Sequence, residues 1–184
     1  MPLPREWRLR LPAWVPEIVA THPGPHDDDS AMALAVALAG EGAARGAGGP
    51  FGAVVLDREG APVAAGPNLV FADGASLAHA EMVALTLAQA SLGTPDLAGA
   101  GLTLVSSAEP CAMCLGALPW SGIGRLVCGA RDADVRAVGF DEGAKPPGWV
   151  EALSARGIAV TRDVGRAAAA RVLREYAETG GQLY

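Results

Sequence analysis

The sequence predicts an α/β fold, a three-layer α/β/α sandwich built around a central mixed sheet of five strands. The first observation is a hairpin: an apolar strand at residues 51–56 turns at residues 57–60 into a second strand through Val63 and Ala64. The second is that later strands alternate with helical segments, as in a sheet covered by helices. The length of 184 residues, 51% of them apolar, favours one core, so we expect a single domain at residues 27–184.

The chain begins with a segment of a different kind. Residues 1–26 mix prolines, tryptophans and arginines without a helical or strand period, so they are expected to form an irregular N-terminal arm. The carboxylates of residues 27–29 then precede an alanine-rich run to about Arg45. Acidic side chains at a helix start accept hydrogen bonds from its free N–H groups, so this run predicts the first helix. Residues 46–50 end that helix.

The remaining elements follow from composition and from helix-start signals. Good helix formers follow Ala78, and Pro110 suits a helix start because the N–H that it lacks would be unpaired there. A loop containing Asn68 separates the hairpin from the next helix. We expect helices at residues 78–92, from about 111, at 149–155 and at 166–178, and strands at 102–107, 123–130 and 158–162.

Charge and composition limit the classes of function. The net charge of −6 gives no general attraction to a phosphate backbone, so a small-molecule substrate is favoured over nucleic acid. No apolar stretch approaches the roughly 20 residues that cross a bilayer, and no secretion signal is visible, so a cytoplasmic protein without a membrane partner is expected. Three cysteines in such a chain argue against a disulfide framework and direct attention to metal or thiol chemistry.

Three residues have the types and spacing of a catalytic zinc site. Cys111 and Cys114 are three positions apart, so they lie on one face of the first turn of a helix that starts at Pro110. His79 precedes Cys111 by one crossover unit, which allows the two helix starts to face each other. Three protein ligands leave the fourth tetrahedral position open, as in catalytic rather than structural zinc sites. We predict one Zn²⁺ per subunit.

Glu81 is expected to move protons beside this metal. It lies two residues after His79, too close to be a second ligand on the same helix face. Zinc activates water for attack on a ring carbon, and the carboxylate can pass protons to the ring and to the departing ammonia. Cys128, inside a predicted strand, is interpreted as a small buried apolar side chain. A redox Cys-x-x-Cys pair and a purely structural zinc site are the alternative interpretations.

These residues carry a family resemblance. A His-x-Glu followed by Pro-Cys-x-x-Cys is the signature of zinc nucleobase deaminases. The sequence resembles the cytidine deaminase superfamily, and within it most closely the bacterial guanine deaminase and nucleoside deaminase branch. The matching residues are 49–54, Asn68, 78–81, 109–117, Trp120 and 139–141. The resemblance implies a zinc-dependent hydrolytic deaminase of purine metabolism, which acts on a small aminated heterocycle, guanine as base or nucleoside, and releases ammonia.

The resemblance also implies a set of substrate contacts. Asn68 would hydrogen-bond the ring, Phe51 and Trp120 would line the pocket, and Ala80 of the His-Ala-Glu motif would bind substrate. Asp134 would accept hydrogen bonds from the amino and ring N–H groups of guanine, with Glu142 as the neighbouring alternative.

The resemblance extends to the chain end, but it fails at two positions before the zinc motif. Tyr184 resembles the C-terminal tyrosine that, in family guanine deaminases, reaches an active site in a swapped homodimer, so a homodimer with C-terminal exchange is implied. The sequence departs from the guanine deaminase pattern at Ser76 and Leu77, where Pro-Thr is usual, and its arm is longer.

Other functions are compatible with the same zinc motifs. A transfer-RNA adenosine deaminase needs a basic surface, which the acidic balance disfavours. A cytosine-type pyrimidine deaminase is a closer alternative, because the motifs do not separate pyrimidine from purine. A binding protein on a deaminase scaffold is disfavoured because Glu81 is intact.

Overall fold

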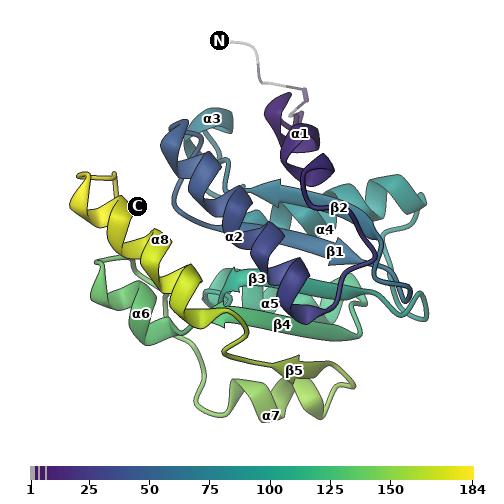
Figure 1. The fold of residues 1–184 in the computed structure, drawn as a ribbon. Helices are drawn as coiled ribbons and strands as arrows, with labels where there is room; N and C mark the ends of the chain where they lie inside the picture. Colours follow the sequence, from purple (N-terminus) through teal and green to yellow (C-terminus); the bar gives the residue numbers. More distant parts are fainter. Residues whose placement is uncertain (1–2, 4, 7) are drawn as a thin grey trace.

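Five strands form one mixed sheet in the order β2-β1-β3-β4-β5 in the computed structural model, which describes residues 3, 5–6 and 8–184 (Figure 1). β1 runs antiparallel to both β2 and β3, whereas β3, β4 and β5 are parallel. The strands are β1 (Gly52–Leu56), β2 (Pro62–Pro67), β3 (Thr103–Ala108), β4 (Arg125–Ala130) and β5 (Ala159–Thr161). The expected mixed five-stranded sheet is confirmed.

The central strands are buried on both faces. Successive side chains of a strand point to opposite faces. In β1, Val54 packs with Val105 and Val127 on one face, whereas Ala53 and Val55 join the core on the other. This double burial explains why these strands are nearly continuous apolar runs in the sequence.

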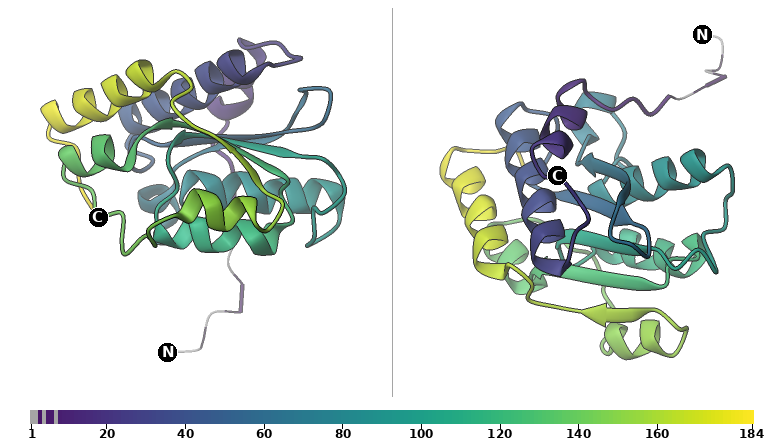
Figure 2. Two further views of the ribbon diagram at one scale, coloured as in Figure 1. Left: turned by 90° about the horizontal axis from the view of Figure 1, so that it is seen from below. Right: turned by 45° about the vertical axis from the view of Figure 1, so that its right-hand side comes forward.

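Helices cover both faces and complete three layers. On one face, α2 (Asp28–Ala44) packs on β1 and β3, and α8 (Arg166–Glu178) packs on β4. On the other face lie α4 (Ala80–Leu92), against β1 and β2, and α7 (Trp149–Ser154), beside β5. The helix α5 (Ala112–Ser121) contacts α4 on this second face, and Figure 2 (left) shows the two helical layers with the sheet between them. The expected sandwich is therefore confirmed.

The start of α2 follows the expected capping pattern. The side chain of Asp27 accepts a hydrogen bond from the backbone N–H of Ser30 at 2.9 Å, which satisfies one of the free donors of the first turn. The next residue, Asp28, accepts two hydrogen bonds from Arg125 of β4. The acidic run thus both begins the helix and fixes it to the sheet.

Three short helices were not expected from the sequence. The irregular arm contains α1 (Trp14–Ala20), so that expectation is wrong for these residues. The side chain of Val15 is almost fully buried in the core under α2, and this packing outweighs the weak local signal. The helices α3 (Val70–Asp73) and α6 (Asp132–Ala137) occupy expected loops. Residues 1–2, 4 and 7 of the arm lie outside the described residues, and the boundary at residue 27 stays a prediction.

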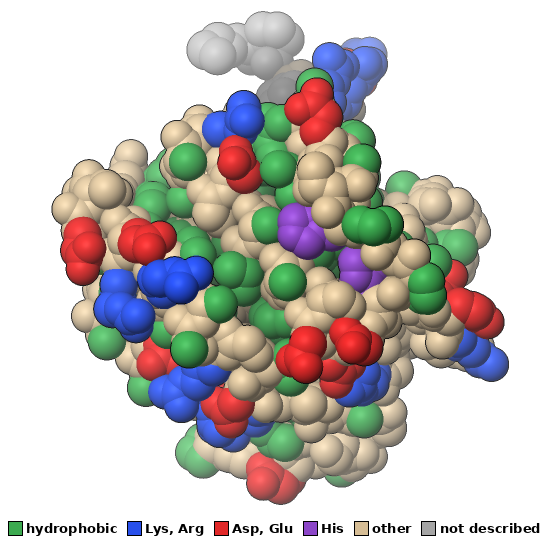
Figure 3. All heavy atoms as spheres, viewed as in Figure 1, with side chains coloured by type: hydrophobic (Ala, Val, Ile, Leu, Met, Phe, Trp, Pro, Cys, Tyr) green, Lys and Arg blue, Asp and Glu red, His purple; other side chains and the backbone are tan. Residues whose placement is uncertain are grey.

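The surface carries both signs of charge. On the face seen in Figure 3, acidic and basic side chains are interspersed rather than separated into one basic patch. The helices that the structure describes include none with the length and apolar character needed to cross a bilayer. The cytoplasmic location stays a prediction.

Candidate metal centre and active site

The first two site residues are the N-cap residues of two helices. His79 precedes α4 and Cys111 precedes α5, and both have extended backbone conformations. Neither side chain caps its own helix. N-caps are usually Ser, Thr, Asp or Asn, whose side chains turn back on the helix. An imidazole and a thiol at these positions instead remain available to each other, and the positive ends of two helix dipoles lie beside them.

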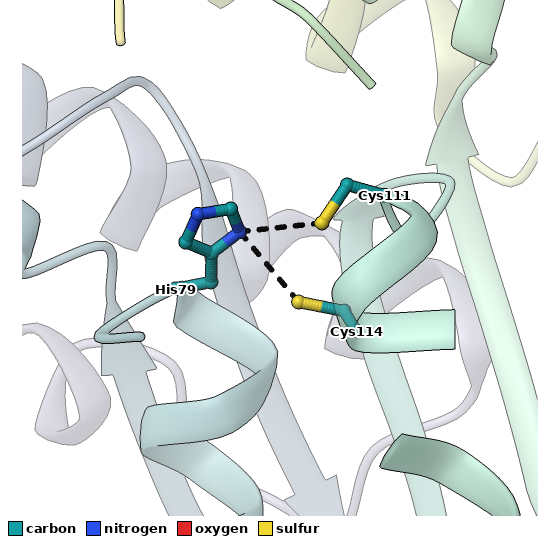
Figure 4. Close-up of side chains that lie close together, drawn as sticks. All are labelled: His79, Cys111 and Cys114. Atoms are coloured by element: carbon teal, nitrogen blue, oxygen red, sulfur yellow. Dashed lines mark hydrogen bonds between the residues drawn. The ribbon is translucent and has the colours of Figure 1, made fainter. Parts of the chain in front are cut away.

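His79, Cys111 and Cys114 converge on one point (Figure 4). The Nδ1 atom of His79 lies 3.5 Å from the sulfur of Cys111 and 3.6 Å from that of Cys114. The three atoms are all within 4.8 Å of one another, and no second cluster of three such groups occurs among the described residues. One imidazole nitrogen and two thiol sulfurs are the ligand types that zinc prefers. The donor set therefore fits zinc with a coordination position left open.

The two thiols differ in protonation. A hydrogen bond from Cys114, together with His79, lowers the pKa of Cys111 to about 4. The same hydrogen bond and burial raise the pKa of Cys114. Burial lowers the pKa of His79, but its hydrogen bond with Cys111 and the nearby charge of Glu81 outweigh this effect and raise it. These contacts favour the thiolate form of Cys111, which is the form that binds metals.

Glu81 lies in the first turn of α4 and is buried. The hydroxyl of Ser106 on β3 donates to its Oε1 at 3.2 Å, and the sulfur of Cys114 lies 3.6 Å from its Oε2. Burial and the neighbouring Cys111 raise the pKa of the Glu81 carboxyl. A carboxyl group with a raised pKa that contacts the ligand cluster is suited to accept and to donate protons.

A cavity of about 480 Å³ opens onto this cluster. Its wall includes Phe51, whose ring packs edge-on against Phe140 with 5.0 Å between ring centroids. The lining residues are Phe51, Asn68, Val70, Ser76, His79, Glu81, Glu109, Cys111, Ala112, Met113, Phe140, Asp141, Glu142, Gly143 and Tyr184. Flat aromatic walls with a few polar groups are typical of sites for small planar ligands.

Asn68 and Tyr184 lie together in this cavity. The amide oxygen of the buried Asn68 accepts hydrogen bonds from the backbone N–H groups of Gly49 and Val70, so its orientation is fixed. Its NH₂ group donates to the hydroxyl of Tyr184. The Tyr184 ring lies edge-on to His79, with 5.8 Å between ring centroids. The last residue of the chain therefore enters the cavity of its own chain.

The structure contradicts the expected position of Asp134. This residue does not line the cavity, because its carboxylate accepts two hydrogen bonds from Arg166 of α8 and one from the backbone N–H of Arg131. The neighbouring alternative, Glu142, lines the cavity and is buried. Burial raises the pKa of Glu142 to about 7, although Lys145 opposes this shift.

Two further expected contacts lie outside the cavity. The side chain of Trp120 is 85% exposed at the end of α5 and lines a separate surface groove, so it does not line the cavity as expected. Ala80 faces the apolar core between α4 and the sheet and is absent from the cavity wall. Trp120 follows the Cys-x-x-Cys motif closely in sequence, but the direction of α5 carries it away from the site.

Sequence reasoning missed several groups near the metal cluster. Ser106 of β3 carries no motif of its own, and Phe140, although it belongs to the matching residues 139–141, was given no contact. Glu109 is nearly fully buried and accepts hydrogen bonds from Arg162 and from the backbone N–H of Asp132. Its position directly before Pro110 and Cys111 was the available signal for a role near the ligand loop.

Comparisons with known proteins agree with this geometry. The family "Cytidine and deoxycytidylate deaminase zinc-binding region" matches residues 25–130, more than half of the chain. A guanine deaminase of Bacillus subtilis is 42% identical over 108 residues, which are 59% of this chain and 67% of that protein. A tRNA(Ile)-lysidine synthase of Deinococcus radiodurans is 46% identical over 60% of this chain. The chain matches only 18% of that longer protein.

Solved structures extend the similarity to nearly the whole chain. A structure described as a guanine deaminase from Nitrosomonas europaea has a TM-score of 0.87 and 41% identity, covering 97% of this chain and 100% of that one. A variant protein with one asparagine replaced by alanine, in complex with 8-azaguanine, gives a TM-score of 0.89 and 42% identity. That match covers 95% of this chain and 98% of the other.

Proposed function

Because the chain belongs to the cytidine and deoxycytidylate deaminase family, we propose that it is a zinc-dependent hydrolytic deaminase whose substrate is guanine. The observation that carries the proposal is one cavity that opens onto the His-Cys-Cys cluster and is lined by three buried acidic residues, Glu81, Glu109 and Glu142. Structures similar along nearly the whole chain, described as a guanine deaminase and as an 8-azaguanine complex, support it.

His79, Cys111 and Cys114 would hold the zinc, which supplies activation of a water molecule for attack on the aminated ring carbon. Glu81 would accept a proton from the attacking water and return protons to the ring nitrogen and to the departing amino group. Water and the amine are thereby converted to a carbonyl product and ammonia. The contact of Ser106 with Oε1 of Glu81 orients this carboxyl group.

Guanine fits the polar groups that line the rest of the cavity. Its ring N–H and 2-amino group are donors, and Glu142 supplies acceptor oxygens at the cavity wall. A base without these donors would leave Oε1 of Glu142, the oxygen that Lys145 does not contact, without a hydrogen bond, which disfavours its binding. The amide NH₂ of Asn68 would donate to a ring acceptor, and Phe51 would pack against the ring.

We also propose a homodimer through the face of α5 and α7. The exposed Trp120 borders a groove formed with Pro119, Trp149 and Leu153. Exposed tryptophans beside apolar grooves are typical of interfaces rather than of free surface. Light scattering should give twice the chain mass for the wild type and the chain mass for Trp120→Glu. Monomeric wild-type protein would rule out the dimer. Tyr184 lines the cavity of its own chain, and the implied C-terminal exchange between subunits stays a prediction.

Ammonia release across a panel of substrates tests the function directly. The panel contains guanine, guanosine, cytosine, cytidine, adenine and a transfer-RNA anticodon stem, with zinc content measured on the same preparation. We expect guanine to give the highest kcat/KM with about one zinc per chain. Preference for cytosine would replace the proposed substrate but keep the reaction class, and zinc-loaded protein inactive on the whole panel would contradict the proposal.

A further inference from the structure

Lys145 is a buried ammonium group beside the site. Its side chain is 7% exposed, although it belongs to the loop between α6 and α7. Lysine is almost never fully buried unless its charge is paired, because loss of its hydration is costly. The surroundings of this side chain therefore have to compensate its charge.

Two hydrogen bonds and one ion pair surround the ammonium group of Lys145. The Nζ atom donates to the backbone carbonyl of Pro110 at 3.0 Å and to Oε2 of Glu142 at 3.1 Å. It also lies 2.8 Å from Oδ1 of Asp132. Two of its three donors are therefore used in hydrogen bonds, and two carboxylates lie close enough to compensate its charge. These contacts join three separate segments: the residue before Cys111, the start of α6, and the cavity wall.

The hydrogen bond from Lys145 restricts the orientation of the Glu142 side chain, which lines the cavity. Lys145 engages Oε2 of this carboxyl group, and no hydrogen bond to its Oε1 is found among the described residues. The backbone of Glu142 is held as well, because its carbonyl accepts a hydrogen bond from the N–H of Ala112 at 2.9 Å. Hydrogen bonds thus connect Glu142 to the loop that carries Cys111 twice, through Lys145 from its side chain and through Ala112 from its backbone.

We propose that Lys145 is a positioning residue that holds the Glu142 carboxylate in the orientation that reads the donor edge of an aminopurine. The proposal rests on the proposed function, since it needs Glu142 to contact the substrate. Lys145 does not touch the substrate in this arrangement. It acts by holding Oε2 of Glu142 and by fixing the distance between this carboxyl group and the loop that carries Cys111.

A double-mutant cycle tests this coupling. The variants are Lys145→Met, which keeps the apolar stem, Glu142→Gln and the combination, each measured for kcat/KM on guanine, zinc content and thermal stability. Loss of an oriented charge-assisted hydrogen bond should lower kcat/KM about 10- to 100-fold in each single variant. The double variant should be no slower than the slower single variant, because both changes remove the same interaction. Zinc content should stay at the wild-type level in all three.

A matched control separates positioning from stability. Asp132→Asn weakens another contact of Lys145 away from the cavity, so it should lower the thermal midpoint with less than a threefold change in kcat/KM. If Lys145→Met does not fold, Lys145→Gln, whose amide keeps N–H donors, takes its place in the cycle. Multiplicative losses in the double variant, or zinc loss from Lys145→Met, would overturn the positioning role. Wild-type protein that is inactive on guanine would instead overturn the proposed function, and the positioning role with it.

Discussion

The two walls of the cavity are built in different ways. The metal wall consists of the first turns of α4 and α5, where His79, Glu81, Cys111 and Cys114 lie within short motifs on rigid helix starts. The second wall, the loop wall, adjoins the first and consists of loops and the chain end. Glu142 there is held by Lys145, and Tyr184 is held by a hydrogen bond with Asn68 and by aromatic contacts.

The two walls should therefore respond differently to substitution. The backbone of the metal wall is fixed by helix formation and by burial of α4 and α5 against the sheet. The loop wall depends on individual side-chain contacts, such as those of Asn68 with Tyr184 and of Lys145 with Glu142, and such contacts are easier to rearrange. Changes on the metal wall should therefore abolish metal binding or chemistry, whereas changes on the loop wall should alter substrate binding and leave zinc in place.

The largest effect is expected from loss of a ligand. Cys111→Ala or His79→Ala should lose zinc and reduce turnover to the background rate, because two remaining donors hold the metal far more weakly. Cys128→Ala is the matched control, since Cys128 is a fully buried thiol of β4 outside the cluster. Zinc per chain, measured by elemental analysis with turnover on the same samples, checks this prediction. Equal zinc loss from all three variants would contradict the ligand assignment.

The next effect separates chemistry from metal binding on the same wall. Glu81→Gln keeps the shape of the side chain but cannot accept a proton from water. Turnover should fall by about 10³- to 10⁴-fold, the upper range for general acid–base catalysis, while zinc content and folding are retained. Single-turnover deamination with metal analysis tests it, and Glu59→Gln, an exposed carboxylate of the β1–β2 turn, is the control. Zinc loss from Glu81→Gln would make this residue a support of the metal site instead.

The sequence predicted the sheet and its principal helices because their signals are local. Apolar strands, the Asp27 cap and helix formers after Ala78 each act over a few residues, and the structure confirms the elements they predict. The helix α1 was missed because its stability comes from burial of Val15 under α2, which no local pattern shows.

The site was predictable on one wall only. His79 and Cys111 converge because each is the N-cap of its helix, and the spacing of the motifs already indicated two facing helix starts. Asp134 and Glu142 are both acidic residues near Gly139, and the sequence did not show that only Glu142 lines the cavity. The position of Arg166 decides between them by pairing with Asp134. That pairing spans 32 residues and depends on how α8 packs.

A moderate effect is expected at the chain end. Deletion of Tyr184 removes edge-on contacts with Phe71, His79 and Phe140, and aromatic pairs are worth about 0.5–1.5 kcal/mol each. We expect KM for the best substrate to rise about 10-fold, with zinc content unchanged. Tyr184→Phe loses only the hydrogen bond to Asn68 and should change KM less. Steady-state kinetics of both variants decide this, and full activity after deletion would exclude a role for the chain end.

The smallest effect is expected at Asp134, and it concerns stability rather than activity. Asp134→Asn removes the charge that pairs with Arg166 but keeps an oxygen for the backbone N–H of Arg131. Partly exposed ion pairs contribute about 0–1 kcal/mol, so the thermal midpoint should fall by no more than about 4 °C. Because this carboxylate lies outside the cavity, kcat/KM should stay within twofold of wild type. A large loss of kcat/KM at normal stability would indicate that Asp134 contacts the substrate after all.

The pH dependence of the difference in stability between wild type and Asp134→Asn identifies the cause of that difference. The hydrogen bond from Arg166 lowers the pKa of folded Asp134 below its ordinary value of 3.8. A carboxyl group with a depressed folded pKa stabilises the fold above its unfolded pKa, and this contribution is lost as the pH falls through the folded pKa. The difference in unfolding free energy between wild type and Asp134→Asn should therefore be constant from about pH 5 to 7 and shrink below about pH 4. Urea unfolding across this range measures it. A difference that persists undiminished below pH 3 would mean that the aspartate stabilises the start of α6 through shape and hydrogen bonding, without any contribution from its charge.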